Sequence, residues 1–132
     1  PVNRRQRQMC IRDSIYLVPT GSKMEISANK HGLKVASEIF ADRNYLDDGN
    51  LVSRKEINAV ITDPEVAKEH VLFMVKNQAL RCLSGKQIPC KIDSICIHGD
   101  TLRSLETAKI IKSNLVNNGF ELKPLNKMKK FL

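Results

Sequence analysis

The sequence lacks several features that would point directly to a function. It has no tryptophan, only two tyrosines and four phenylalanines in 132 residues, and no long apolar run. A membrane-spanning helix needs roughly 18–20 apolar residues. The first residues are polar and arginine-rich, which is not the pattern of a secretory signal. We therefore expect a cytoplasmic protein with no membrane contact.

Metal and nucleotide motifs are missing as well. There is no C-x-x-C pair, no zinc-finger spacing of histidines and no G-x-x-x-x-G-K-[ST] loop. The sequence therefore predicts neither a zinc module nor a P-loop nucleotide site, and no metal ligands can be assigned. Without a secretory signal, the four cysteines are expected to be reduced and structural: Cys10, Cys82, Cys90 and Cys96.

The net charge of +8 is concentrated at the two ends of the chain. Residues 1–14 hold four arginines and one aspartate, residues 123–132 hold four lysines, and residues 15–122 hold 14 basic and 13 acidic side chains. A nucleic-acid-binding protein carries its basic residues on a folded face, so we expect no nucleic-acid partner. We interpret 1–14 as a disordered or non-native basic arm, resembling adapter read-through, and 123–132 as a basic C-terminal tail.

Residues 15–122 alternate between apolar runs and helical patterns. This alternation predicts βα units. Two of the apolar runs lack polar residues, as is typical of strands that are buried on both faces of a parallel sheet. We expect an α/β domain too small for an eight-fold βα barrel, which needs about 250 residues. Exposed strand edges then indicate a fragment. The predicted strands are 15–18, 33–40 and 94–97 with a further one from 120, the helices are 22–32, 64–78 and 101–118, and a hairpin spans 81–91.

Polar residues directly follow two of the predicted strands. Substrates of parallel α/β folds bind beyond the carboxyl ends of the strands. His98 is a candidate general base or ligand whose tautomer the nearby Asp100 fixes. The alternative is that Asp100 caps the next helix and His98 is an ordinary polar residue at a strand end. Gly99 between them permits close backbone approach or an unusual dihedral angle.

The second polar group is Asp42-Arg43, after the strand predicted at 33–40. The guanidinium of Arg43 suits a two-pronged clamp on a substrate carboxylate. The alternative is an ion pair of Arg43 with Asp42, Glu38 or Asp100 that anchors the long loop at 41–58. Arg54 in that loop is either another anion contact or a solvated charge.

The other two histidines are expected to be structural. His31 lies at a predicted helix C-terminus, where a partly charged imidazole complements the helix dipole. His70 falls on the apolar stripe of the helix at 64–78 and is predicted to pack in the core.

Four blocks carry a resemblance to a known family. They read EIFADRNY at 38–45, GNLVSR at 49–54, AVITD at 59–63 and DSICIHGD at 93–100. From about Tyr16 to Leu122 the chain resembles the C-terminal half of the LamB/YcsF, or lactam-utilisation, family. The FADR and HGD blocks are its signatures.

The resemblance implies a fold, a reaction and partners. The fold is the C-terminal half of a βα barrel of the glycoside hydrolase/deacetylase type, incomplete in this chain. The reaction is ATP-dependent cleavage of 5-oxo-L-proline to L-glutamate, with ATP as cofactor and partner subunits B and C. The family's N-terminal blocks are absent, so we expect the fragment alone to be inactive. The implied catalytic residues are His98, Asp100 and Asp42, and the implied substrate-binding residues are Arg43, Glu38 and Arg54.

Two other functions remain open at this stage. The shared barrel type suggests a metal-dependent deacetylase-like hydrolase acting on carbohydrate or amide substrates, with His98 and Asp100 as ligands. The charge distribution suggests a non-catalytic module that binds acidic partners through residues 1–14 and 123–132.

Overall fold

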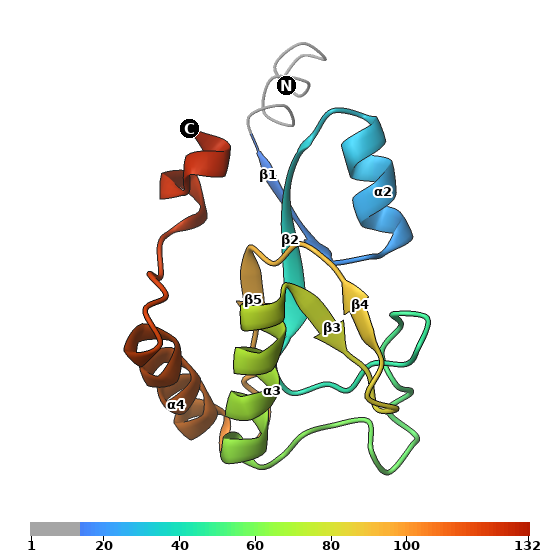
Figure 1. Cartoon of the computed structure of the whole chain (residues 1–132), viewed down its shortest axis with the longest axis vertical. Coiled ribbons are helices and arrows are strands. Elements are labelled where there is room, and N and C mark those ends of the chain that lie inside the picture. The colour runs from blue at the N-terminus through green and yellow to red at the C-terminus, as the bar shows by residue number, and fades with distance from the viewer. Residues whose placement is uncertain (1–13) are drawn as a thin grey trace, which may run out of the picture.

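A three-stranded parallel sheet forms the centre of the protein (Figure 1). The computed structural model describes residues 14–132, so the predicted arm, apart from Ser14, and Cys10 lie outside the described residues. The strands are β1 (Ile15–Pro19), β2 (Lys34–Phe40) and β5 (Ser94–Cys96), in the order β1-β2-β5. The parallel α/β prediction is confirmed, and β2 and β5 are neighbours.

Helix α2 (Lys23–Lys30) connects the first two strands. It begins where the sequence predicts, because the hydroxyl of Ser22 accepts a 3.2 Å hydrogen bond from the backbone amide of Glu25. The Glu25 carboxylate in turn accepts a hydrogen bond from the backbone amide of Gly21 at 2.6 Å. The predicted capping box is thus present, displaced by one residue from the usual pattern.

Helix α3 (Pro64–Asn77) also begins at its predicted signal, with Asp63 as N-cap and proline in the first turn. It ends at Gln78 in the left-handed conformation (φ 47°), and the chain turns directly into a hairpin. The hairpin strands are β3 (Ala79–Arg81) and β4 (Gln87–Pro89), so the expected hairpin at 81–91 is displaced toward the N-terminus.

The C-terminal part departs further from the prediction. Helix α4 (Ser104–Asn117) begins three residues later than expected, and residues 120–122 form no strand. Two 3₁₀ turns follow, η1 (Leu125–Lys127) and η2 (Lys129–Phe131). Lys130 of η2 forms an ion pair with Asp93, whose carboxylate also accepts from the amide of Ser37 in β2 at 2.9 Å. The predicted domain limits at residues 14 and 122 stay predictions.

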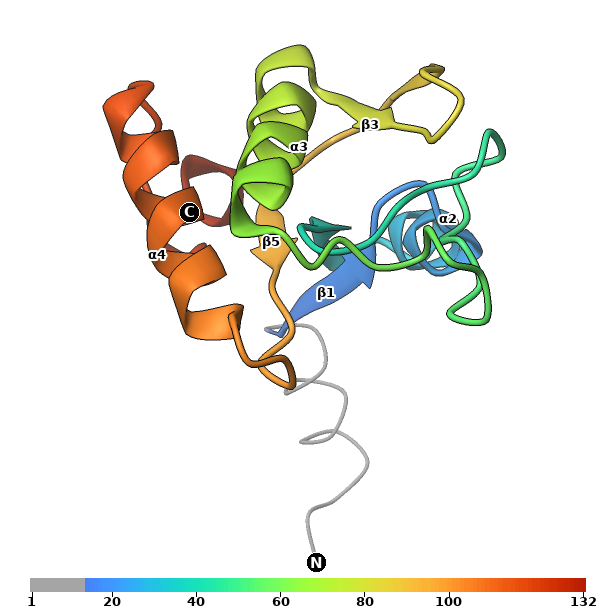
Figure 2. The same cartoon turned by 90° about the horizontal axis from the view of Figure 1, so that it is seen from below.

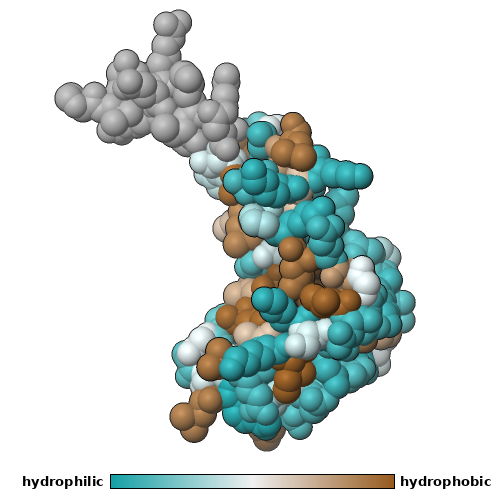
Figure 3. All heavy atoms as spheres, turned by 90° about the vertical axis from the view of Figure 1, so that its left-hand side faces the viewer, coloured by the Kyte–Doolittle hydropathy of each residue, from teal (hydrophilic) through white to brown (hydrophobic). Residues whose placement is uncertain are grey.

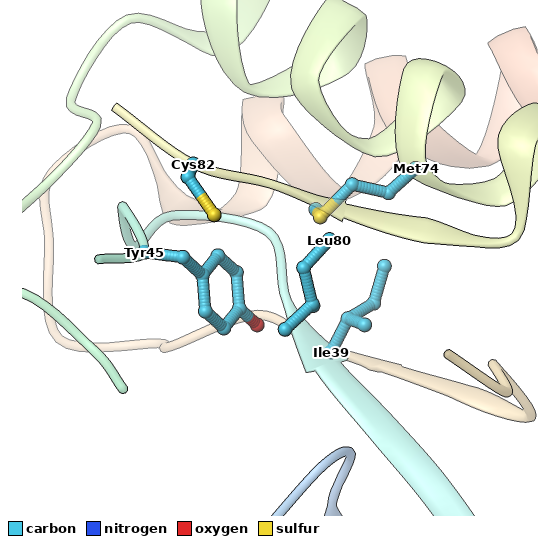
Figure 4. Packing of buried hydrophobic residues seen from close by; sticks show 5 residues of the cluster. All are labelled: Ile39, Tyr45, Met74, Leu80 and Cys82. Carbon is cyan, nitrogen blue, oxygen red and sulfur yellow. The ribbon is translucent and has the colours of Figure 1, made fainter. Parts of the chain in front are cut away.

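The core lies on one face of the sheet. Val35 of β2 packs with Ala28 of α2, and Ala41, just after β2, packs with Val71 of α3. Figure 2 shows α3 and the β3–β4 hairpin on the same side of β5. Between them lies a cluster whose buried members are drawn in Figure 4: Ile39, Tyr45, Met74, Leu80 and Cys82.

The opposite face of β2 and β5 carries a different set of side chains. The strand register pairs Glu38 with Ser94 and Phe40 with Cys96, so these four residues point to the same face. Each is partly exposed, in contrast to the buried Ile39 between Glu38 and Phe40. On β2, this face is therefore less buried than the face that carries Ile39.

A separate apolar groove of about 690 Å³ lies beside β5. Figure 3 shows apolar side chains gathered in the hollow between α4 and the C-terminal segment. The lining includes Ile95, Ile97, Leu115 and Met128. None of the helices between residues 14 and 132 has both the length and the apolar character that spanning a membrane requires.

Candidate functional site

The side chains of Asp42 and His98 meet at the carboxyl edge of the sheet. Asp42 lies two residues after β2 and His98 two residues after β5, and the Ala41 amide continues the strand pairing by donating to the Cys96 carbonyl at 2.9 Å. His98 Nδ1 lies 2.9 Å from Oδ1 and 2.8 Å from Oδ2 of Asp42. The two polar groups that follow the predicted strands thus meet at this pair.

The contact fixes which nitrogen of His98 carries the proton. An ionised carboxylate is only an acceptor, so Nδ1 is the donor and, in the neutral ring, Nε2 keeps its lone pair. Within residues 14–132, Nε2 has no hydrogen-bond partner. The side chain of Asp42 is 11% exposed and that of His98 is 29% exposed. A shielded carboxylate thus orients an imidazole that solvent or a ligand can reach.

Phe40 supports the imidazole from β2. Its ring stacks on His98 with 5.8 Å between the centroids and 9° between the planes. One step back along the two strands, the Ser94 hydroxyl donates to Oε2 of Glu38 at 2.9 Å. Three cross-strand pairs therefore follow one another on this face, which we call the β2–β5 face: Glu38–Ser94, Phe40–Cys96 and Asp42–His98.

Cys96 in this row is not an activated nucleophile. Burial raises the pKa of its thiol, and the carboxylates of Glu38 and Asp42 raise it further. The neutral thiol therefore behaves as a small apolar side chain. Cys82, Cys90 and Cys96 are all free thiols, as predicted.

Asp100 differs from both sequence interpretations. The carboxylate that holds His98 is Asp42, and Asp100 is exposed on the bend before α4. Asp100 is not a helix cap either, because α4 begins at Ser104 with Arg103 at the N-cap position. Gly99 lies outside the left-handed region, and a Cβ built on it meets nothing within 4 Å. A catalytic role for Asp100 stays a prediction.

The guanidinium of Arg43 points into the loop that follows β2. Its Nε donates to the carbonyl of Ala59 at 3.2 Å and its Nη2 to the carbonyl of Val52 at 2.7 Å. Only 7% of Arg43 is exposed. The expected loop anchor is present, but its partners are carbonyls and not the carboxylates of Asp42, Glu38 or Asp100. The carboxylate clamp stays a prediction.

Glu38 and Arg54 occupy different surroundings. Glu38 is half-buried on the β2–β5 face and is held by Ser94. Arg54 is exposed in the loop between β2 and α3. The structure thus brings Glu38, Asp42 and His98 onto one face, whereas it places no contact between Arg54 and them.

Both remaining histidines are structural, as predicted. His31 is the C-cap of α2, and its Nδ1 lies 2.8 Å from the carbonyl of Ser27. His70 in α3 is 4% exposed, its ring stacks on Tyr45 with 6.3 Å between centroids, and its Nε2 lies 3.2 Å from the carbonyl of Arg43. Burial lowers the pKa of His70 to about 4, so the imidazole is neutral at pH 7.

Sequence analysis missed Phe40 and Ser94 as members of the site. The signal was present, because alternate residues of a strand share a face. Glu38, Phe40 and Asp42 are two residues apart, and so are Ser94, Cys96 and His98. That period identifies the face once the two strands are known to be neighbours.

No resident metal can be assigned from the described residues. Between positions 14 and 132, no three His, Cys, Asp or Glu side chains gather as ligands for an ion. Nor does any stretch of the sequence form a Gly-rich phosphate loop. The donors on the β2–β5 face suit proton transfer and hydrogen bonding.

Comparison with known proteins places the chain. A family model described as the LamB/YcsF family matches residues 6–130. The A subunit of 5-oxoprolinase from Clostridium beijerinckii is 47% identical over 114 residues, covering 86% of this chain and 45% of that protein. Its counterpart from Campylobacter jejuni subsp. doylei is 48% identical over 101 residues, covering 76% and 40%.

A solved structure agrees. The crystal structure of a lactam utilization protein from Thermus thermophilus matches with a TM-score of 0.78 and 30% identity, covering 90% of this chain and 47% of that one. The mixed α/β fold with its parallel sheet is thus shared, and the chain spans less than half the length of these relatives. The resemblance noted in the sequence is confirmed: the chain belongs to the LamB/YcsF family.

Proposed function

We propose that this chain contributes catalytic residues to an ATP-dependent 5-oxoprolinase that opens 5-oxo-L-proline to L-glutamate. The observation that carries the proposal is the Asp42–His98 pair at the carboxyl edge of a parallel sheet. Support also comes from the relatives, which are named as the A subunit of 5-oxoprolinase. That name implies further subunits, and we propose subunits B and C as partners.

The chemistry requires a base close to an activated carbonyl. A five-membered lactam resists hydrolysis, and phosphorylation of its amide oxygen at the expense of ATP makes the carbonyl carbon electrophilic. We assign ATP as a co-substrate with no binding residues in this part of the chain. His98 then acts as a general base: Nε2 takes a proton from the attacking water while Asp42 stabilises the imidazolium through Nδ1. The ring C–N bond breaks as the nitrogen takes that proton, and a second water releases phosphate from the resulting acyl phosphate.

Other residues of the face suit substrate binding. The Glu38 carboxylate, held by Ser94, is an acceptor for the lactam N–H. Arg54, an exposed cation of the loop after β2, is assigned to the substrate carboxylate. Asp100 lies two residues from His98 and is assigned as a second acid or base. A direct clamp by Arg43 remains a prediction, since two of its N–H groups bind carbonyls.

We further propose that the β2–β5 face is one wall of a βα barrel of the glycoside hydrolase/deacetylase type. The shared parallel sheet and the length of the relatives support this architecture. On this proposal, the rest of the barrel is supplied by sequence outside residues 1–132, and the isolated 132-residue chain is inactive.

The test is an assay of glutamate production. The protein is expressed from its complete reading frame together with its partner subunits, and wild type is compared with His98→Ala and Asp42→Asn. We expect His98→Ala to lower kcat by about 10²–10⁴-fold, the usual contribution of a general base. His31→Ala is the matched control, because His31 is an exposed helix cap. Unchanged glutamate production by His98→Ala overturns the proposal.

Further experiments test the substrate-binding role of Arg54 and the two alternative functions. Arg54→Ala is expected to raise KM with little change in kcat if it binds the substrate carboxylate. Metal analysis of the purified protein tests the deacetylase-like hydrolase, since a stoichiometric ion lost together with activity on chelation favours that alternative. Deletion of 1–14 and 123–132 tests the basic module, which requires those ends for binding.

A further inference from the structure

Three separate contacts pin the backbone at the position that carries Asp42. The carbonyl of Asp42 accepts from the amide of Ile61 at 2.9 Å. The guanidinium of the next residue, Arg43, spans the loop to the carbonyls of Val52 and Ala59. Val52 and Ala59 lie 9 and 16 residues after Arg43 in the sequence, so the Arg43 side chain links the start of the loop to two later positions in it.

His70 of α3 supplies the third contact. At 4% exposure its ring is enclosed, and its Nε2 lies 3.2 Å from the carbonyl of Arg43. A carbonyl oxygen can only accept, so Nε2 is the protonated nitrogen of the neutral ring. The stacked ring of Tyr45 fixes the imidazole plane. His70 therefore ties the loop start to α3 without adding a charge.

A held backbone matters because the Asp42 carboxylate must face His98. The contact to both carboxylate oxygens depends on where Asp42 lies, and displacements of about 1 Å are enough to disturb catalytic geometry. Without that acceptor, the proton of a neutral imidazole is free to move to the other ring nitrogen. A proton on Nε2 removes the lone pair that a general base needs.

We propose that Arg43 and His70 form a buried brace that positions Asp42 and thereby keeps the proton of His98 on Nδ1. In this role both are positioning residues, which act through Asp42. The proposal deepens the proposed function, since it assumes that the base is His98 Nε2, but the state of the His98 ring is measurable without any reaction.

The experiment is ¹⁵N NMR of the His98 ring in the uniformly labelled protein, above the pH at which the ring protonates. The ring nitrogen shifts report the share of each tautomer. We expect the Nδ1–H tautomer to dominate in wild type and to give way to a mixture in Arg43→Met and in His70→Phe. His70→Gln keeps an N–H donor at the end of its side chain and is expected to restore the wild-type tautomer.

Matched controls separate the brace from a general loss of stability. Arg103→Lys and His31→Gln change an exposed arginine and an exposed histidine, and both are expected to leave the His98 shifts unchanged. Arg43→Met or His70→Phe with wild-type His98 shifts overturns the proposal. If Arg43→Met does not fold, Arg43→Lys decides, because an ammonium group cannot reproduce the two-pronged fork: a changed tautomer share supports the brace, and wild-type shifts overturn it.

The outcome is independent of the proposed function. Full activity in His98→Ala removes His98 as the base but leaves the tautomer result intact. Conversely, unchanged shifts in the brace variants, together with an inactive His98→Ala, leave the proposed function standing and remove the brace.

Discussion

The hydroxyl oxygen of Tyr45 accepts a 2.8 Å hydrogen bond from the backbone amide of Phe40. The first strand is too short to provide this acceptor, since its last contact with β2 runs from the Thr20 amide to the Glu38 carbonyl. In parallel strands, Glu38 and Phe40 present their backbone groups to the same neighbour. The Tyr45 hydroxyl therefore supplies the acceptor that β1 does not provide for the Phe40 amide. Phe40 is also the residue whose ring stacks on His98.

Tyr45→Phe is expected to destabilise the protein by about 1–3 kcal/mol, because it leaves the partly buried Phe40 amide without an acceptor. The measurement is the free energy of unfolding in urea. Burial raises the pKa of Tyr45 well above its usual value, so the lost group is a neutral hydroxyl. Tyr16→Phe is the control, since Tyr16 is 40% exposed on β1. Equal stability of the two variants contradicts this account.

The burial of His70 predicts a pH-dependent stability. Its folded pKa is about 4 and the ordinary value is 6.5, so between these values the unfolded state binds more protons. Stability is therefore complete above pH 6.5 and falls as the pH drops toward 4. The full loss is about 3 kcal/mol for this shift. Arg81 contributes in the same direction as burial, by repelling the imidazolium.

The measurement is urea unfolding at several pH values between 4 and 7 for wild type and His70→Gln. Glutamine does not titrate, so the unfolding free energy of the variant is expected to lose the part of its pH dependence that comes from His70. The part that comes from other groups is expected to remain. His31→Gln, at an exposed cap, should retain the wild-type slope. A His70→Gln curve parallel to wild type excludes His70 as the source.

The sequence was sufficient to predict a mixed α/β fold with a parallel sheet and most element positions. Ser22 and Asp63 begin helices because their side chains accept from exposed amides of the first turn, which is a local property. The start of α4 was predicted three residues early, because Ser104 caps the turn before it through contacts with Thr101. The sequence permits a helix start at Thr101 or at Ser104, and the structure shows that α4 begins at Ser104.

The partner of His98 was not predictable from spacing. Asp100 is two residues away in sequence, whereas Asp42 is 56 residues away and becomes adjacent only because β2 and β5 are neighbours. Arg43 shows the same limit, because its partners are backbone carbonyls, which leave no signature in side-chain patterns. Contacts that depend on strand order or on the backbone therefore require the three-dimensional structure.

Gly99, the residue after His98, offers a probe of substrate approach to this part of the backbone. Its backbone does not need glycine, and an added Cβ meets nothing within 4 Å. Gly99→Ala is therefore expected to change stability by no more than about 0.5 kcal/mol. If substrate approaches this backbone, the methyl group raises KM in the glutamate assay while the melting temperature stays constant.

Gly49→Ala is the contrasting variant. Gly49 has φ +85°, and its added Cβ lies 3.8 Å from Leu80 and from Ile88. The strained backbone is expected to cost about 1 kcal/mol or more. A larger loss of stability for Gly99→Ala than for Gly49→Ala contradicts the geometry of both positions.

Phe40→Leu tests whether the stacked ring contributes to the chemistry of His98. Leucine keeps the apolar contact of Phe40 with the core but removes the flat surface that lies 9° from the imidazole plane. Aromatic stacking contributes about 0.5–1.5 kcal/mol beyond burial, so kcat is expected to fall by about twofold to tenfold. The measurement is the steady-state rate of glutamate production, with KM determined alongside.

The control for this variant is Phe73→Leu, which removes a ring of equal size in α3 that stacks under Arg81 and not on His98. Phe40 and Phe73 pack against the same core cluster and both are replaced by leucine, so the unfolding free energies of the two variants should be similar. Only Phe40→Leu should lower kcat, because only there does the imidazole of His98 lose the ring that stacks on it. Equal kcat values for the two variants show that the Asp42 contact alone orients His98.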